Sequence, residues 1–95
     1  MRVATEIRAR LAGLEPMRLE LIDDSARHQG HAGARAEGES HFRLLIVAEA
    51  FTGLSRIERQ RRVYGALGDL LATDVHALSI TALSPAEDAA RPASR

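Results

Sequence analysis

The 95-residue chain contains no cysteine, no tryptophan and no lysine, and its aromatic residues are two phenylalanines and one tyrosine. Without cysteine, the chain forms no disulfide, offers no thiolate nucleophile and cannot hold an iron-sulfur cluster by its own thiolates. Histidine is therefore its best ligand for a soft metal ion. So few aromatic residues also leave no series of rings on which the bases of single-stranded nucleic acid would stack.

Long apolar runs and an excess of one charge are absent as well. The longest apolar run, residues 44–48, is far shorter than the roughly 20 residues that cross a bilayer. The first residues interleave charged and apolar side chains, which is not typical of a secretory signal. Thirteen basic residues balance thirteen acidic ones, which disfavours nucleic-acid backbone as the main partner. We expect a soluble, cytoplasmic protein without a membrane partner.

The size and composition predict one folded unit. Hydrophobic residues make up 45% of the chain and charged residues 27%, which is ordinary for a globular protein of one core. We expect a single domain over residues 1–84. A short helical turn, capped by Ser84 and Glu87, and a flexible polar tail are expected over residues 85–95.

Hydrophobic periodicity predicts five elements. In chain order they are a helix over 5–14, strands over 17–24 and 40–51, a helix over 56–72 and a strand over 75–83. The order α-β-β-α-β predicts an α+β fold with a three-stranded mixed sheet. Its first two strands form an antiparallel pair, and a right-handed helical crossover leads to a parallel third strand.

The two central elements carry the clearest patterns. The strand over 40–51 is apolar on both faces near its centre, which predicts an interior strand. Ser55 and Glu58 predict a capping box at the start of the long helix. Arg61 and Arg62 are expected to point away from the centre of that helix, whereas one apolar arc faces the sheet: Ile57, Val63, Tyr64, Leu67, Leu70 and Leu71.

Three histidines occupy unusual positions. His28 and His31 lie in a long connection, residues 25–38, and His76 lies at the start of the last strand. Two solvated loop histidines and one histidine at the rim of the sheet are the simpler explanation, because a pair of imidazoles does not complete a metal site. Together, however, a loop histidine and His76 would supply two neutral ligands to one ion. A partner would have to fill the open positions.

No catalytic constellation is recognisable, so we expect a protein that is not an enzyme. The helix segment with Arg59, Arg61 and Arg62 is typical of a solvated helix face, with a DNA-binding helix as the alternative. The G-x-x-G loop with which KH domains clamp nucleotides is missing.

Four short motifs in order resemble the BolA family over about residues 7–83. They are Glu39-Ser40-His41-Phe42, Phe51-x-Gly53-x-Ser55, Arg59-x-Arg61-x-x-Tyr64 and Val75-His76-Ala77-Leu78. The resemblance implies a fold similar to class II KH domains. It also implies partnership with a monothiol glutaredoxin that carries a CGFS active site.

In that family the two proteins share a 2Fe-2S cluster, to which the glutaredoxin and its glutathione supply thiolates. The resemblance assigns the histidine ligands to His76 and His31, with His28 as the alternate. Gln60 stands where the family usually has histidine, and no aromatic residue follows the last strand. We expect a non-enzymatic adaptor in iron-sulfur cluster trafficking or iron homeostasis. A DNA-binding transcriptional regulator that uses the arginine-rich helix is the alternative.

Overall fold

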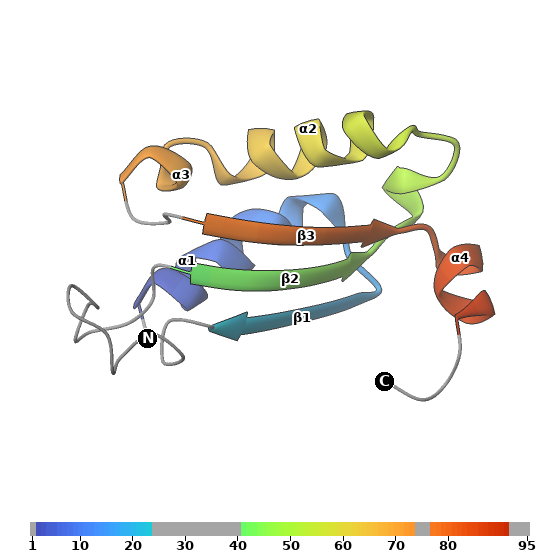
Figure 1. Ribbon diagram of the computed structural model, residues 1–95, viewed down its shortest axis with the longest axis horizontal. Helices are drawn as coiled ribbons and strands as arrows, with labels where there is room; N and C mark the ends of the chain where they lie inside the picture. Colours follow the sequence, from blue (N-terminus) through green and yellow to red (C-terminus); the bar gives the residue numbers. More distant parts are fainter. Residues whose placement is uncertain (1, 24–40, 74–76, 92–95) are drawn as a thin grey trace.

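The computed structural model describes residues 2–23, 41–73 and 77–91, and it contains the predicted mixed sheet (Figure 1). The strands are β1 (Arg18–Asp23), β2 (His41–Val47) and β3 (Ala77–Leu83), and β2 lies between the other two. β1 pairs with β2 in antiparallel fashion and β3 pairs with β2 in parallel, which confirms the α+β class. Within the described ranges, no helix has the length and apolar character needed to cross a bilayer.

Both long helices pack on the same face of the sheet. Helix α1 (Arg2–Leu11) and helix α2 (Arg56–Leu67) contribute to one hydrophobic core with the central strand. Side chains of β2 that point into this core are almost completely buried, and so are the inward residues of the helices: Ile7, Leu11, Phe42, Leu44, Ile46, Val63 and Leu67. On the opposite face of β2, Arg43 is exposed and Leu45 is half-buried. The interior position predicted for this strand is confirmed, with the helices covering one of its faces.

The strand predicted over 40–51 is too long. β2 ends at Val47, and the chain then turns through the 3₁₀ segment η3 (Glu49–Phe51). The Phe51 N–H donates to the Ala48 carbonyl at 3.1 Å, and the Phe51 side chain is completely buried. The turn therefore replaces further strand because it carries a large aromatic side chain into the core.

The helix predicted over 56–72 is broken at Gly68. Helix α2 ends at Leu67, Gly68 has φ +60° and ψ −132°, and the short helix α3 (Leu70–Thr73) follows. From α1, Arg10 donates to the Leu67 carbonyl at 2.5 Å, so one of the carbonyls left open at the helix end is satisfied. A glycine permits this conformation, whereas a continuous periodicity does not reveal it.

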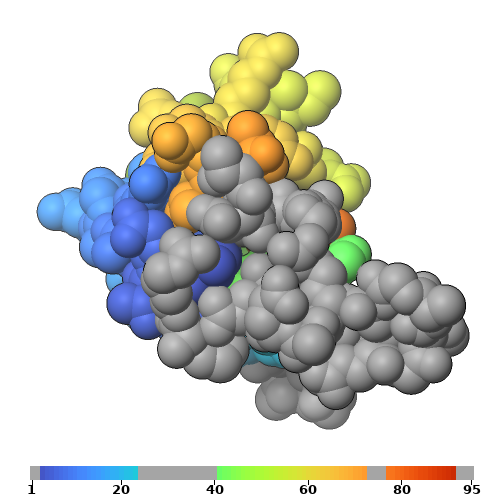
Figure 2. All heavy atoms as spheres, turned by 90° about the vertical axis from the view of Figure 1, so that its left-hand side faces the viewer, coloured from blue at the N-terminus to red at the C-terminus, as the bar shows by residue number. Residues whose placement is uncertain are grey.

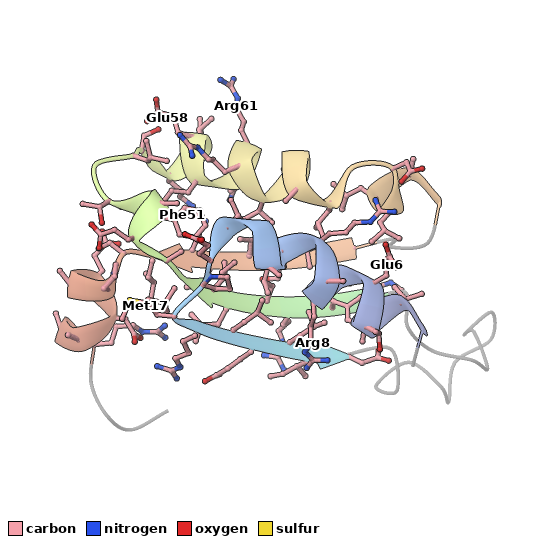
Figure 3. All side chains as sticks on the ribbon, turned by 180° about the vertical axis from the view of Figure 1, so that it is seen from behind. Glu6, Arg8, Met17, Phe51, Glu58 and Arg61 are labelled. Atoms are coloured by element: carbon pink, nitrogen blue, oxygen red, sulfur yellow. The ribbon has the colours of Figure 1, made fainter. Side chains whose placement is uncertain are left out.

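The apolar arc predicted on α2 is only partly correct. Val63 and Leu67 are fully buried, but the side chain of Ile57 is 61% exposed and that of Tyr64 is 41% exposed. Successive helical residues are about 100° apart, so Tyr64 points well away from the stripe that Val63 begins. The predicted outward orientation of Arg61 is confirmed, and Figure 3 shows it directed away from the sheet.

Two glycines of this region should respond to alanine in opposite ways. Gly68→Ala should lower the free energy of unfolding by about 1–3 kcal/mol, because alanine is strained at a positive φ. Its Cβ would also lie 3.3 Å from the Arg10 Nη1 atom. Gly65→Ala, inside α2 with open space around it, should raise the free energy of unfolding by about 0.5–1 kcal/mol. Urea denaturation of both variants measures the two changes, and equal effects would contradict the helix break.

Candidate functional site

The starts of β2 and β3 meet the end of β1 at one end of the sheet. In the strand register, Asp23 at the end of β1 faces Phe42, and His41 at the start of β2 faces Ala77. Residues 24–40 and 74–76 join the sheet at these points. Figure 2 views the molecule from this side, with α1 in blue and α3 in orange. The two joining segments contain His28, His31 and His76, which fall outside the described residues. The binding of one ion by these histidines therefore stays a prediction.

His41 is the histidine that the structure describes. It is half-buried as the first residue of β2 and lies opposite Ala77, the residue that follows His76. Among the described residues, no group of three histidine, cysteine, aspartate or glutamate side chains is arranged to hold a metal ion. A complete metal site at this end of the sheet would therefore need ligands from outside the described part of the chain.

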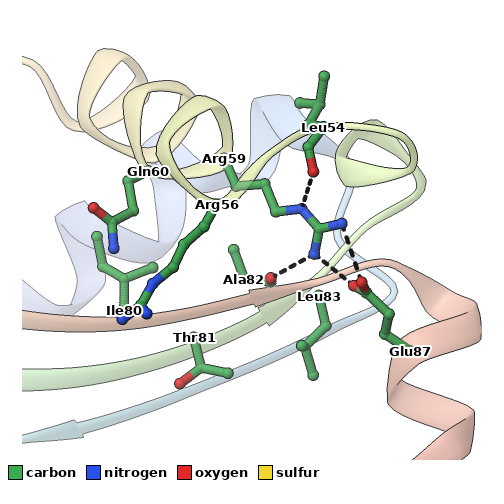
Figure 4. Close-up of a pocket in the computed structure, with 9 residues that line it drawn as sticks. All are labelled: Leu54, Arg56, Arg59, Gln60, Ile80, Thr81, Ala82, Leu83 and Glu87. Atoms are coloured by element: carbon green, nitrogen blue, oxygen red, sulfur yellow. Dashed lines mark hydrogen bonds and ion pairs between the residues drawn. The ribbon is translucent and has the colours of Figure 1, made fainter.

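The Arg59 side chain is hydrogen-bonded to other parts of the fold and does not belong to an open basic face (Figure 4). Its Nε donates to the Leu54 carbonyl at 3.0 Å, and its Nη1 donates to the Ala82 carbonyl at 3.0 Å. Both terminal nitrogens also bond the carboxylate of Glu87, at 2.5 and 3.2 Å. Only 13% of the Arg59 side chain is exposed. Of the three arginines considered for DNA contact, this one is already bonded by its own fold.

The Arg59 contact depends on how helix α4 (Pro85–Ala90) begins. The Ser84 side chain accepts from the Glu87 N–H at 3.2 Å, and the Glu87 carboxylate accepts from the Ser84 N–H at 2.8 Å. This is the cap predicted from the sequence. The hydrogen bonds from Arg59 and then from the Ser84 backbone lower the pKa of Glu87 to about 2, so its carboxylate is ionised at neutral pH.

A second ion pair ties α4 to the first strand. Arg18 of β1 donates to both carboxylate oxygens of Asp88, at 3.0 and 3.2 Å, and also bonds Glu20. The contact joins residues 70 positions apart, so no local pattern in the sequence announces it. With Arg59 and Arg18 both bonded to its side chains, α4 is part of the packed unit.

Two of the three basic residues of α2 other than Arg59 form a small outer patch. Arg61 and Arg62 are exposed and line a shallow hollow together with Leu54 and Glu58. The Ser55 backbone N–H and side chain lower the pKa of Glu58, and the two arginines add to this effect. The patch therefore combines two positive charges with one negative charge.

A pocket lies beside the first turns of α2, between that helix and the edge of β3 that faces away from β2. It has a volume of about 420 Å³, and its lining includes Leu54, Arg56, Gln60, Ile80 and Ala82 (Figure 4). Periodicity does not predict this pocket, because its lining residues come mainly from α2, β3 and α4, which only the tertiary fold brings together.

Comparisons with known proteins agree with this fold. A family model described as BolA-like protein matches residues 11–87. SufE-like protein 1 of Arabidopsis thaliana, named as chloroplastic/mitochondrial, is 47% identical over 78 residues, which cover 78% of this chain and 21% of that protein. The Escherichia coli protein named DNA-binding transcriptional regulator BolA is 41% identical over 69 residues, which cover 73% of this chain and 62% of that protein.

A solved structure of BolA1 from Arabidopsis thaliana superimposes with a TM-score of 0.77 at 40% identity. The match covers 88% of this chain and 93% of that structure. The chain thus spans about a fifth of the first of the two relatives and less than two thirds of the second.

The Arg59–Glu87 contact makes stability depend on pH in a specific range. A carboxyl group whose pKa falls on folding stabilises the fold above its ordinary pKa, here 4.5, and this stabilisation is lost as the pH falls toward about 2. Glu87→Gln, which keeps a capping side chain, should destabilise the protein at pH 6 and lose this disadvantage progressively toward pH 2. Thermal denaturation at several pH values measures the difference.

The matched control is Glu58→Gln, which changes the capping box of α2 but touches no bound arginine. Glu58→Gln should reduce the pH dependence of the protein's stability less than Glu87→Gln does. If wild type and Glu87→Gln lose stability in parallel below pH 4.5, the Arg59–Glu87 contact does not form in solution.

Proposed function

The chain belongs to the BolA family, and we propose that it is a non-catalytic adaptor in iron-sulfur cluster trafficking or iron homeostasis. In this proposal it binds a 2Fe-2S cluster jointly with a monothiol glutaredoxin of the CGFS type. His76 supplies one ligand, and His31, with His28 as the alternate, supplies the other.

The observation that carries the proposal is the register at the end of the sheet. His41 faces Ala77 in the parallel pair, and Asp23 faces Phe42 in the antiparallel pair. The segment with His28 and His31 therefore joins the sheet beside the residue that follows His76. Since β2 is hydrogen-bonded on both sides, these attachment points are held in a fixed arrangement.

The chemistry of the chain fits a shared cluster better than a cluster of its own. It has no cysteine, so every thiolate must come from the glutaredoxin and its glutathione. Imidazole ligands raise the reduction potential of a 2Fe-2S cluster relative to thiolates. Histidine binds metal in its neutral form, so this chain's share of the ligation should weaken as the pH falls.

The cluster proposal is tested by titrating a cluster-loaded CGFS glutaredoxin with the chain. Wild type should change the visible circular dichroism of the cluster, and His76→Ala should abolish that change because an iron ligand is removed. His31→Ala and His28→Ala identify which loop histidine takes part. His41→Ala is the matched control, because it removes an imidazole at the same end of the sheet and should leave the spectral change intact.

A second measurement separates loss of a ligand from loss of the fold. Calorimetry should show that metal-free glutaredoxin still binds the His76→Ala variant. An unchanged visible spectrum in His76→Ala, identical to that of wild type, would contradict the ligand assignment.

Two observations favour a second candidate function, which is DNA binding in transcriptional regulation. Arg61 and Arg62 are exposed side by side on α2, and a relative at 41% identity is named as a DNA-binding transcriptional regulator. In this alternative the two arginines contact phosphates, whereas Arg59 is already bonded to Glu87.

For DNA binding, the affinity should fall steeply with salt. Replacing both Arg61 and Arg62 with glutamine should reduce the slope of log K against log salt by about 0.9 for each phosphate that the protein no longer neutralises. Arg8→Gln, at an exposed arginine on α1, is the control and should leave the slope unchanged. Fluorescence anisotropy with a labelled duplex measures the slopes, and no binding at low salt would remove this candidate.

A further inference from the structure

The outer edge of β3 is not paired with another strand in the described part of the chain. β3 is the last strand of the sheet, with β2 on its inner side. The Leu83 carbonyl accepts from Ala48 on that inner side at 3.0 Å, whereas the Ala82 carbonyl accepts from Arg59 at 3.0 Å on the outer side. Backbone groups alternate along a strand, so Ile80 directs its N–H and C=O outward, as Ala82 does. No hydrogen bond joins these outward groups of Ile80 to a described residue.

This open edge lies inside the 420 Å³ pocket beneath α2. Leu54 and Gln60 form the side of the pocket nearer the helix, and Ile80 and Ala82 form the side nearer the strand (Figure 4). The volume falls within the range of about 300–1,000 Å³ that is usual for ligand clefts. Apolar side chains and open backbone groups therefore meet in one groove.

Arg56 supplies an unpaired positive charge at this groove. It is exposed, lines the pocket and makes no ion pair with any other residue that the structure describes. As the first residue of α2, it lies at the end of the helix where the helix dipole favours anions over cations. Its guanidinium extends from the helix toward β3 at Ile80 (Figure 4). Local helix electrostatics therefore do not account for an arginine at this position, whereas an external anion would.

We propose that this groove binds an extended peptide segment of a partner protein, which adds as a strand to the outer edge of β3 and places one carboxylate on Arg56. Strand addition uses the outward N–H and C=O of Ile80. The ladder is short, because Arg59 already bonds the next outward carbonyl, that of Ala82. Arg59 thus marks one end of the site.

The charges of the groove favour a peptide over a nucleic acid. Glu87 and Arg59 both lie in the lining and neutralise each other, so the groove offers a phosphate backbone no row of positive charges. Arg56 is the one cation of the described lining without an ion-pair partner among the described residues, which matches one carboxylate. The described lining contains no aromatic ring for base stacking.

The proposal is tested by NMR on the full ¹⁵N-labelled chain with synthetic hexapeptides of alternating threonine and valine. Two versions carry aspartate at the first or the last position, and each has an asparagine control. At millimolar concentration, an aspartate peptide should shift the amide signals of Ile80 and Ala82 and slow hydrogen exchange at Ile80. The asparagine peptide and Arg56→Gln should each weaken binding about fivefold, and the two changes together should weaken it no further.

Two controls keep strand addition and charge recognition separate. A peptide N-methylated at alternate residues loses the donors that face β3, so it should not bind, and this test needs no change in the protein. Arg61→Gln removes a neighbouring charge outside the pocket and should leave the affinity unchanged. Arg56→Gln should be at least as stable as wild type, because it removes a cation from the positive end of a helix.

Three results would overturn the proposal. One is the absence of any shift at Ile80 with either aspartate peptide. Another is equal binding of the N-methylated peptide. The third is an oligothymidylate that shifts the same signals and competes with the peptide, because the groove would then be a nucleic-acid site.

Discussion

One partly buried guanidinium group holds together the part of the molecule where three elements meet. Arg59 bonds the carbonyl before α2, a carbonyl of the last strand and the carboxylate that caps α4. A charged group with little exposure is costly unless each donor has a partner, so these elements fix one another's positions. Arg59 lines the 420 Å³ pocket and links the start of α2 to α4, which Arg18 also holds through Asp88. The same contact leaves Arg56, Arg61 and Arg62 as the exposed basic residues of α2.

The features that the sequence predicts correctly come from patterns that involve only a few neighbouring residues. Alternation in β2 and the capping box at Ser55 and Glu58 are local patterns, and both occur in the structure. The element order then leaves few topologies, which is why the mixed sheet and its parallel pair could be predicted. The motifs that resemble the BolA family led to the family that the comparisons confirm.

The errors arise where tertiary contacts override a local pattern. β2 stops early because Phe51 is drawn into the core, and the long helix breaks where Gly68 takes a positive φ beside Arg10. The tie from Arg59 to Glu87 spans 28 residues and that from Arg18 to Asp88 spans 70, so neither leaves a periodic signal. Of the candidate site, the strand ends could be predicted from the element order. The pocket at Arg56 could not be, since its lining residues come mainly from α2, β3 and α4, which are far apart in the sequence.

The position of β3 has a consequence for how a partner could be held. Ala77 begins the strand at the end where the histidine-bearing segments attach, and Ala82 lies near the other end beside the groove. At about 3.3 Å per residue, these two points are roughly 17 Å apart along one rigid element. A single partner that touched both would bind the second at the high effective concentration set by the first. Two weak contacts on one edge strand would then give lasting association, and breaking either would release the partner quickly.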